Sequence, residues 1–186
     1  MRASFTIVGV LALTVVAPRA EAQSQSRVKL GAAFGPGWET RGAGGPSGTH
    51  FALSATLNRA SSRLSYRLET MLDDDEQSRR GAASSIRLHR HATFALTVSA
   101  VRRFSKQPTG AYAIGGVGLY HQWNEMIQRE PDAAEERTGL WSNARPGVNA
   151  GLGYTFTLRG QEMFIESRYH TTGFESRIPI SIGVRI

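Results

Sequence analysis

The feature that most constrains the fold of this 186-residue chain is the alternation in its last quarter, residues 161–186. In the segments 163–170 and 178–186, every second residue is apolar with one exception, Ser167, and the residues between are mostly polar or small. Side chains of a β-strand point to opposite faces with a period of two. Each segment is therefore predicted to be a strand with one apolar and one polar face. The apolar positions are Met163, Ile165, Tyr169, Ile178, Ile180, Ile182, Val184 and Ile186.

The same alternation recurs along the chain and predicts eight strands. They are expected at 28–35, 50–58, 63–72, 85–104, 111–122, 147–158, 163–170 and 178–186. The longest connections, 36–48, 73–84 and 123–145, alternate with short turns, as in up-and-down outer-membrane barrels. The strand 111–122 has two similar faces, and Tyr112, Ile114 and Tyr120 are assigned outward. The predicted fold is an all-β, eight-stranded antiparallel up-and-down transmembrane β-barrel.

The N-terminus has the pattern of a cleaved signal peptide. Arg2 precedes an apolar stretch at 5–17, and Ala20-Glu21-Ala22 is a small-x-small cleavage site. We therefore expect residues 1–22 to be the signal peptide and residues 23–186 to form the barrel. No later apolar run is long enough for a spanning helix, so a membrane location requires a barrel.

Charge and cysteine content exclude several classes of function. The formal net charge is +7, but the basic residues form no run with interleaved aromatics, so nucleic acid is not an expected partner. The chain has no cysteine, which excludes disulfides and thiol chemistry. The Asp73-Asp74-Asp75-Glu76 run lacks the spacing of a calcium loop, and His89 and His91 have no visible third ligand. We predict no metal and no cofactor.

A soluble lipocalin-like binder would show the same alternation, with its apolar face inward and a charged exterior. Here the non-apolar face is mostly Gly, Ala, Ser, Thr and Asn, which suits the narrow interior of an eight-stranded barrel. The apolar face is therefore expected to contact lipid. The three tryptophans, Trp38, Trp123 and Trp141, are predicted to lie at the membrane interface, where aromatic residues are enriched.

The ordered set of segments 112–120, 151–154, 164–170 and 178–186 resembles eight-stranded outer-membrane β-barrel proteins of the OmpA-like and opacity-protein type. The resemblance implies a bacterial outer-membrane location with extracellular loops and periplasmic termini. It also implies insertion by the barrel-assembly machinery. Contact with outer-membrane lipid is expected from the apolar face, and the basic charge balance favours anionic surfaces, lipopolysaccharide among them. Such families commonly end in an aromatic residue, and Ile186 departs from that pattern.

Five ionisable residues are expected to point into the lumen: Arg67, Glu69, Glu166, Arg168 and His170. Buried charges must be paired, so we predict a salt-bridge cluster that plugs the barrel. The same residues would line the path of a small-molecule or ion conduit, which is the alternative.

An enzyme that modifies outer-leaflet lipid is a further alternative, because His170 is followed by Thr171, Thr172 and Glu175. No serine stands two residues after this histidine, and no hydrolase motif is present, so we assign no catalytic residue. The predicted function is a structural or surface-interaction role, with an extracellular partner that the sequence does not identify.

Overall fold

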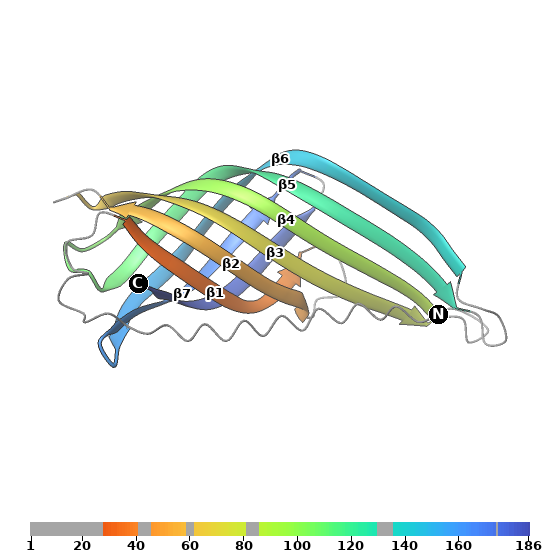
Figure 1. The fold of residues 1–186 in the computed structure, drawn as a ribbon, viewed down its shortest axis with the longest axis horizontal. Coiled ribbons are helices and arrows are strands. Elements are labelled where there is room, and N and C mark those ends of the chain that lie inside the picture. The colour runs from red at the N-terminus through yellow and green to blue at the C-terminus, as the bar shows by residue number, and fades with distance from the viewer. Residues whose placement is uncertain (1–27, 41–45, 59–61, 81–85, 130–135, 174) are drawn as a thin grey trace.

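The computed structural model describes residues 28–40, 46–58, 62–80, 86–129, 136–173 and 175–186. Its eight strands form one closed barrel in which each strand is antiparallel to both neighbours (Figure 1). The strands are β1 (Val28–Glu39), β2 (Pro46–Asn58), β3 (Leu64–Arg80), β4 (Ile86–Arg103), β5 (Gly110–Arg129), β6 (Glu136–Leu158), β7 (Gln161–Thr171) and β8 (Ser176–Arg185). The predicted fold class is confirmed. The predicted signal peptide, 1–22, lies outside the described residues.

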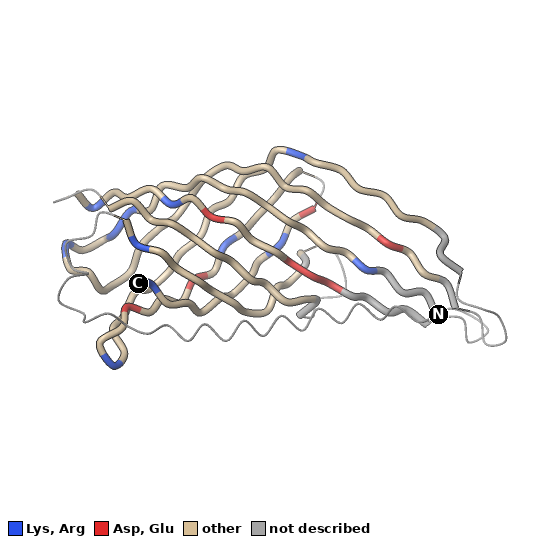
Figure 2. The backbone as a smooth tube through the Cα atoms, in the orientation of Figure 1, with Lys and Arg blue, Asp and Glu red and all other residues tan. Residues whose placement is uncertain are grey.

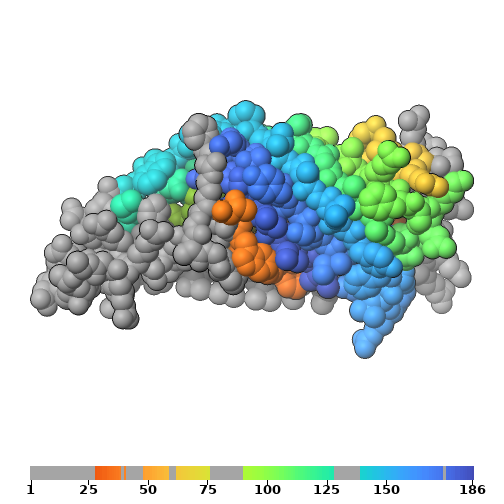
Figure 3. Space-filling view, turned by 180° about the vertical axis from the view of Figure 1, so that it is seen from behind, coloured from red at the N-terminus to blue at the C-terminus, as the bar shows by residue number. Residues whose placement is uncertain are grey.

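The two ends of the barrel differ. One end holds the short turns 104–109 and 159–160 together with the start of β1 and the end of β8. At the other end, β3, β4, β5 and β6 continue well past the neighbouring strands (Figure 1). We call this extension, residues 76–80, 86–92, 122–129 and 136–147, the raised wall. Figure 3 shows its β6 part, in cyan, standing beyond β7 and β8, in blue.

The raised wall corrects two loop predictions. Residues 73–80 continue β3, and residues 123–129 and 136–145 belong to β5 and β6. These segments are polar and lack a clear apolar alternation, so they read as solvated loops. Once β4 and β5 lie beside them, their backbone groups complete the same antiparallel hydrogen-bond ladders as the barrel strands. A strand that lies above the membrane can form such a ladder without an apolar face, so its sequence need not alternate.

The outer face of the barrel is apolar and its interior is polar. Leu68, Leu152 and Ile180 point outward with exposed fractions of 50%, 63% and 40%, which confirms the predicted orientation. Among the described residues, a belt of apolar side chains without charge surrounds the middle of the barrel on its outer face. The belt consists of Leu30, Phe34, Phe51, Leu53, Leu68, Leu72, Phe94, Leu96, Val98, Val117, Leu119, Val148, Leu152, Ile165, Ile180 and Ile182. This arrangement suits hydrocarbon outside the barrel.

The outward assignment of Tyr112, Ile114 and Tyr120 was wrong. All three are buried inside the barrel, and the outward residues of β5 are Val117 and Leu119. The register with β4 and β6 decides which residues of β5 face inward, because β5 alone has two similar faces.

Within the described residues, no helix is long and apolar enough to cross a membrane.

Gly153 on β6 makes room for the ring of Tyr112. These two residues are register partners, and a Cβ atom built on Gly153 would lie 2.3 Å from Tyr112 Cζ. Likewise, a Cβ atom on Gly183 of β8 would lie 2.4 Å from Phe164 Cζ. The inward glycines therefore let large side chains fill an otherwise narrow lumen.

We expect Gly153→Ala to destabilise the barrel by about 1–3 kcal/mol, the typical cost of overpacking. The added methyl group would displace Tyr112 from its bonded position. Urea unfolding of the protein refolded in lipid vesicles measures the change. Gly115→Ala is the matched control on β5, because its nearest neighbour would lie 3.6 Å away. Equal effects of the two substitutions would contradict the packing explanation.

Candidate functional site

Four ionisable side chains meet in the lumen between β3 and β7, which lie on opposite sides of the barrel. Arg67 and Glu69 stand two residues apart on β3, and Glu166 and Arg168 stand two apart on β7. Each pair therefore points to the same face of its strand. All four side chains are buried. We call these four residues the central network.

The central network is closed by ion pairs across the lumen. Arg67 Nη1 donates to both oxygens of Glu166, at 3.1 and 2.9 Å, and Arg168 Nε lies 2.6 Å from Glu166 Oε1. Arg168 also donates to Glu69, which lies 3.7 Å from Arg67 Nη1. Two guanidinium groups thus face two carboxylates, so the formal charges balance. Pairing of this kind offsets the large cost of removing charges from water.

Two aromatic residues, Tyr112 and Phe164, and the guanidinium group of Arg185 extend the central network toward the end with the short turns. Tyr112 donates to Glu166 Oε2 at 2.6 Å and accepts a bond from Arg185 at 3.3 Å. The guanidinium groups of Arg185 and Arg67 lie 4.4 and 5.5 Å from the ring centre of Phe164. Contacts of this kind between a cation and an aromatic face are favourable.

An ionic group also ties the closing strands of the barrel together. Glu162 of β7 pairs with Lys29 of β1 and, at 3.1 Å, with Arg185 of β8. Nearby, the backbones of Leu30 and Ile186 exchange two hydrogen bonds of 2.8–2.9 Å. Side chains and backbone therefore both join the first strand to the end of the chain.

His170, the fifth residue predicted for the lumen cluster, lies in a separate group. Its ring is buried, and its Nδ1 atom lies 3.0 Å from the hydroxyl oxygen of Tyr120. The two rings meet edge to face, with centres 6.0 Å apart. The structure thus brings four of the five predicted residues together and places His170 nearer the raised wall.

A second polar cluster surrounds His170 at the mouth of the barrel. The His50 ring donates to Asp73 at 2.7 Å, and His91 lies 2.6 Å from Asn124 Oδ1 and 3.1 Å from Glu175. Gln122 donates to Glu175 at 2.7 Å. Among the described residues, no three His, Asp or Glu side chains are grouped to hold a metal ion.

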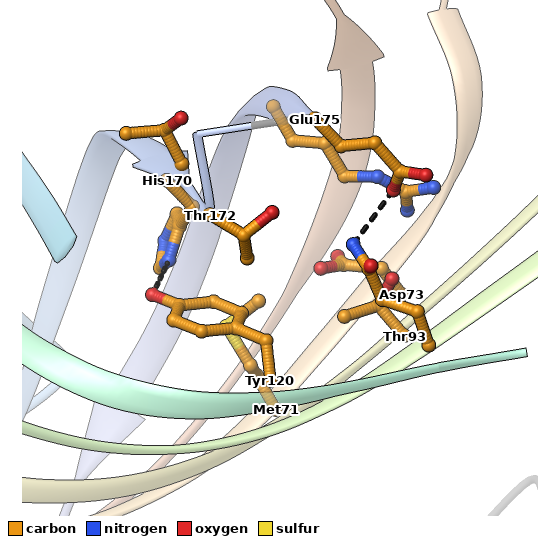
Figure 4. A pocket seen from close by; sticks show the side chains of 10 residues that line it. Met71, Asp73, Thr93, Tyr120, His170, Thr172 and Glu175 are labelled. Carbon is orange, nitrogen blue, oxygen red and sulfur yellow. Dashed lines mark hydrogen bonds between the residues drawn. The ribbon is translucent and has the colours of Figure 1, made fainter. Parts of the chain in front are cut away.

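This second cluster encloses a small pocket, here called the mouth pocket, with about 20 Å³ of space for water-sized groups. Figure 4 shows His170, Thr172 and Glu175 on one side of it and Tyr120 and Met71 on the other. Its lining residues are Met71, Asp73, Thr93, Tyr120, Gln122, His170, Thr171, Thr172, Glu175 and Arg177.

Sequence reasoning missed much of both clusters. The weak alternation of β5 predicts Tyr112 and Tyr120 on the outer face, and the charge of the segment 73–84 predicts a loop at Asp73, so none of the three is predicted to lie in the lumen. Figure 2 shows the acidic run of residues 73–75 as a red stretch along a strand, where Asp73 and Asp75 are buried and Asp74 is exposed. If the segment 73–75 is taken as a strand, the period of two indicates that Asp73 and Asp75 share one face and Asp74 the other, which is the signal in the sequence that could have found Asp73.

The three tryptophans do not share one face. Trp38 is paired with Ile178, and Trp123 follows Leu119 and His121 at two-residue spacing on the outer face of β5. Trp141 instead pairs with Asn124, which is buried on the inner side, and its exposed fraction is 45%. For all three tryptophans, a place at the membrane interface stays a prediction.

No protein-family model matches the sequence, and no curated protein matches it either. Solved structures do share its fold. A major outer membrane protein from Thermus thermophilus aligns with a TM-score of 0.54 at 11% identity, over 87% of this chain and 100% of that one. Neisserial surface protein A aligns with a TM-score of 0.50 at 15% identity, over 86% and 94% of the two chains.

Ail, the attachment invasion locus protein of Yersinia pestis, aligns with a TM-score of 0.50 at 12% identity, over 86% of this chain and 96% of that one. At these identities the likeness concerns the fold. Together with the apolar exterior, the fold is that of a bacterial outer-membrane barrel, which agrees with the location that the sequence predicts.

Proposed function

We propose that this protein is an outer-membrane barrel whose lumen is closed by the central network and whose role is structural or in surface interaction. The observation that carries the proposal is the set of ion pairs that joins β3 to β7 across the lumen. An open conduit needs a continuous aqueous path, and in an eight-stranded barrel side chains fill the interior.

The raised wall supports the second part of the proposal. It lies at the end with the long connections, which in outer-membrane barrels is extracellular. The periplasmic end then holds both described ends of the chain. Binding residues commonly sit on segments that a rigid scaffold holds in place. We assign no catalytic role to the barrel. Its expected partners in the envelope are outer-membrane lipid, lipopolysaccharide and the barrel-assembly machinery.

Membrane fractionation and electrophoresis test the location. The protein is expected in the outer-membrane fraction after a carbonate wash, and it should migrate differently before and after boiling. Release by the wash, with no difference in migration, would contradict the membrane location.

Planar-bilayer recording tests the closed lumen. We expect the wild-type barrel to insert without stable open-channel current, because four buried charges block the lumen. Frequent, long-lived openings of the wild-type protein would instead establish the conduit alternative. Insertion is checked in parallel by protease protection of the refolded protein in vesicles, so that a silent recording is not mistaken for failed insertion.

A further inference from the structure

We propose that one corner of the barrel, at the end with the short turns, binds the headgroup of an anionic phospholipid, with Arg102 in contact with its phosphate. The start of β3, the end of β4 and the turn 104–109 form this corner, and its basic residues are Arg63, Arg102, Arg103 and Lys106. We call these four residues the basic corner. The inference rests on the proposed function in placing this end of the barrel in the periplasm. It adds a lipid partner and the residues that recognise it.

Arg102 points away from the barrel at the edge of its lipid-facing surface. It lies four residues after the outward Val98 on β4, so it shares the outer face, and its side chain is exposed. Arg102 is the next-to-last residue of β4, and its register partner Leu64 is the first residue of β3. It therefore lies where the apolar surface approaches the water of the periplasm, which is the depth of lipid headgroups.

The neighbours of Arg102 on the outer face are apolar and offer it no counter-charge. Leu64 and Ala113 are its register partners on the two adjacent strands, and Ala100 and Phe104 are the nearest residues on its own face of the chain. Among the described residues, the side chain of Arg102 forms no ion pair or hydrogen bond. An arginine at the edge of hydrocarbon is stabilised when its head reaches a polar or anionic group. A headgroup phosphate lies at this depth and accepts two N–H groups of a guanidinium at once.

Two further arginines of the basic corner are bound to uncharged groups. Arg63 Nη1 donates to the backbone oxygen of Phe104 at 3.5 Å, and the backbone N–H of Arg103 donates to the carbonyl oxygen of Arg63 at 2.8 Å. These contacts hold Arg63 beside the end of β4. The side chain of Arg103 donates to Asn58 Oδ1 at 3.3 Å. Neither side-chain contact neutralises the charge of a guanidinium group.

The basic corner as a whole has no acidic counterpart. Lys106 is exposed in the turn after β4, and the segments 62–66 and 100–113 contain no Asp or Glu. Figure 2 shows Lys and Arg residues, in blue, gathered at this end of the barrel. Within the part of the chain that the structure describes, no member of the corner forms an ion pair. An anionic partner therefore complements the corner better than a zwitterionic one.

Aromatic residues beside the basic corner support its place at headgroup depth. Tyr66 is exposed on the outer face and pairs with Ala100, which stands two residues before Arg102. Phe104, also exposed, stands two residues after Arg102. Outer-membrane barrels carry such aromatic residues at both interfaces of the apolar band. The periplasmic leaflet of a bacterial outer membrane is phospholipid, so the partner is an anionic phospholipid and not lipopolysaccharide.

Native mass spectrometry of the purified full-length protein, released from detergent micelles, tests the proposal. The probes are phosphatidylglycerol and phosphatidylcholine, which share a phosphate but differ in net charge, and inorganic phosphate is the soluble competitor. We expect phosphatidylglycerol to bind saturably and about five times more tightly than phosphatidylcholine. Arg102→Gln is expected to weaken the binding of phosphatidylglycerol about fivefold, the effect of one basic residue near an anionic headgroup.

Arg159→Gln is the matched control, because it removes the same charge from an exposed arginine in the turn 159–160 at the same end of the barrel. It is expected to leave the binding of phosphatidylglycerol unchanged. The difference in migration before and after boiling verifies that each variant is folded. If Arg102→Gln loses that difference, Lys106→Gln serves as the second corner variant, because Lys106 lies in a turn outside the sheet. It is expected to weaken binding about two- to fivefold.

Four results would overturn the proposal: no saturable binding of phosphatidylglycerol, equal affinity for the two lipids, equal losses from Arg102→Gln and Arg159→Gln, or displacement of the lipid by an equal concentration of inorganic phosphate. The last result would indicate a site for free anions. A closed, membrane-inserted barrel without a preference for phosphatidylglycerol would refute this inference and leave the proposed function standing. A protein that fails fractionation would refute the proposed function first.

Discussion

Replacing Glu166 with glutamine is expected to lower the free energy of unfolding by about 3–5 kcal/mol, the usual cost of breaking a buried ion pair by removing one partner. Glu166 contacts Arg67, Arg168 and Tyr112, so the neutral amide would leave two buried guanidinium groups facing only Glu69. Urea unfolding in lipid vesicles, followed by tryptophan fluorescence, measures the difference.

Asp74→Asn is the control for this substitution, because it removes a carboxylate from the exposed face of β3. Its effect is expected to stay within about 0.5 kcal/mol, as for most surface substitutions. The conductance of each variant is recorded as well, because the loss of an ion pair across the lumen is also a way to open the barrel to ions. Unchanged stability together with increased conductance would show that the central network is a gate in a conduit and not a plug.

Replacing Leu152 with arginine is expected to destabilise the inserted barrel by about 2–4 kcal/mol, the cost of a basic side chain at the bilayer midplane. Leu152 lies near the middle of the apolar belt on β6, with 63% of its surface exposed. Unfolding from vesicles measures the cost, and the same variant should insert more slowly than the wild type.

The same strand offers the control for Leu152→Arg. Leu140 also points outward on β6 and is 76% exposed, but it lies in the raised wall, beyond the last pairing of β6 with β7. Leu140→Arg is expected to cost little, because the charge stays in water. Equal costs at both positions would show that hydrocarbon does not surround the belt.

The central network illustrates how far sequence reasoning reaches into a site. Arg67 and Glu69, like Glu166 and Arg168, share the polar face of a clearly alternating strand, so their inward direction followed from periodicity. Their meeting depended on the closed eight-strand order, which places β3 opposite β7. Tyr112 escaped prediction because alternation on β5 is weak, with glycines on both faces.

The mouth pocket could not be predicted in the same way. Its residues come from five strands and the turn after β7, and Asp73 sits in a charged run that resembles a solvated loop. Only the pairing of β3 with β2 and β4 shows that the side chain of Asp73 points inward while that of Asp74 points outward. A one-residue change of register would exchange the two.

By itself, the sequence determined the number of strands, their antiparallel order and the apolar outer face, because a period of two is a local property that each strand carries alone. The tertiary structure decided the length of β3–β6 beyond the barrel, the facing of β5 and the partners of every lumen charge. Those features depend on register and on contacts between distant strands, which become defined only when the barrel closes.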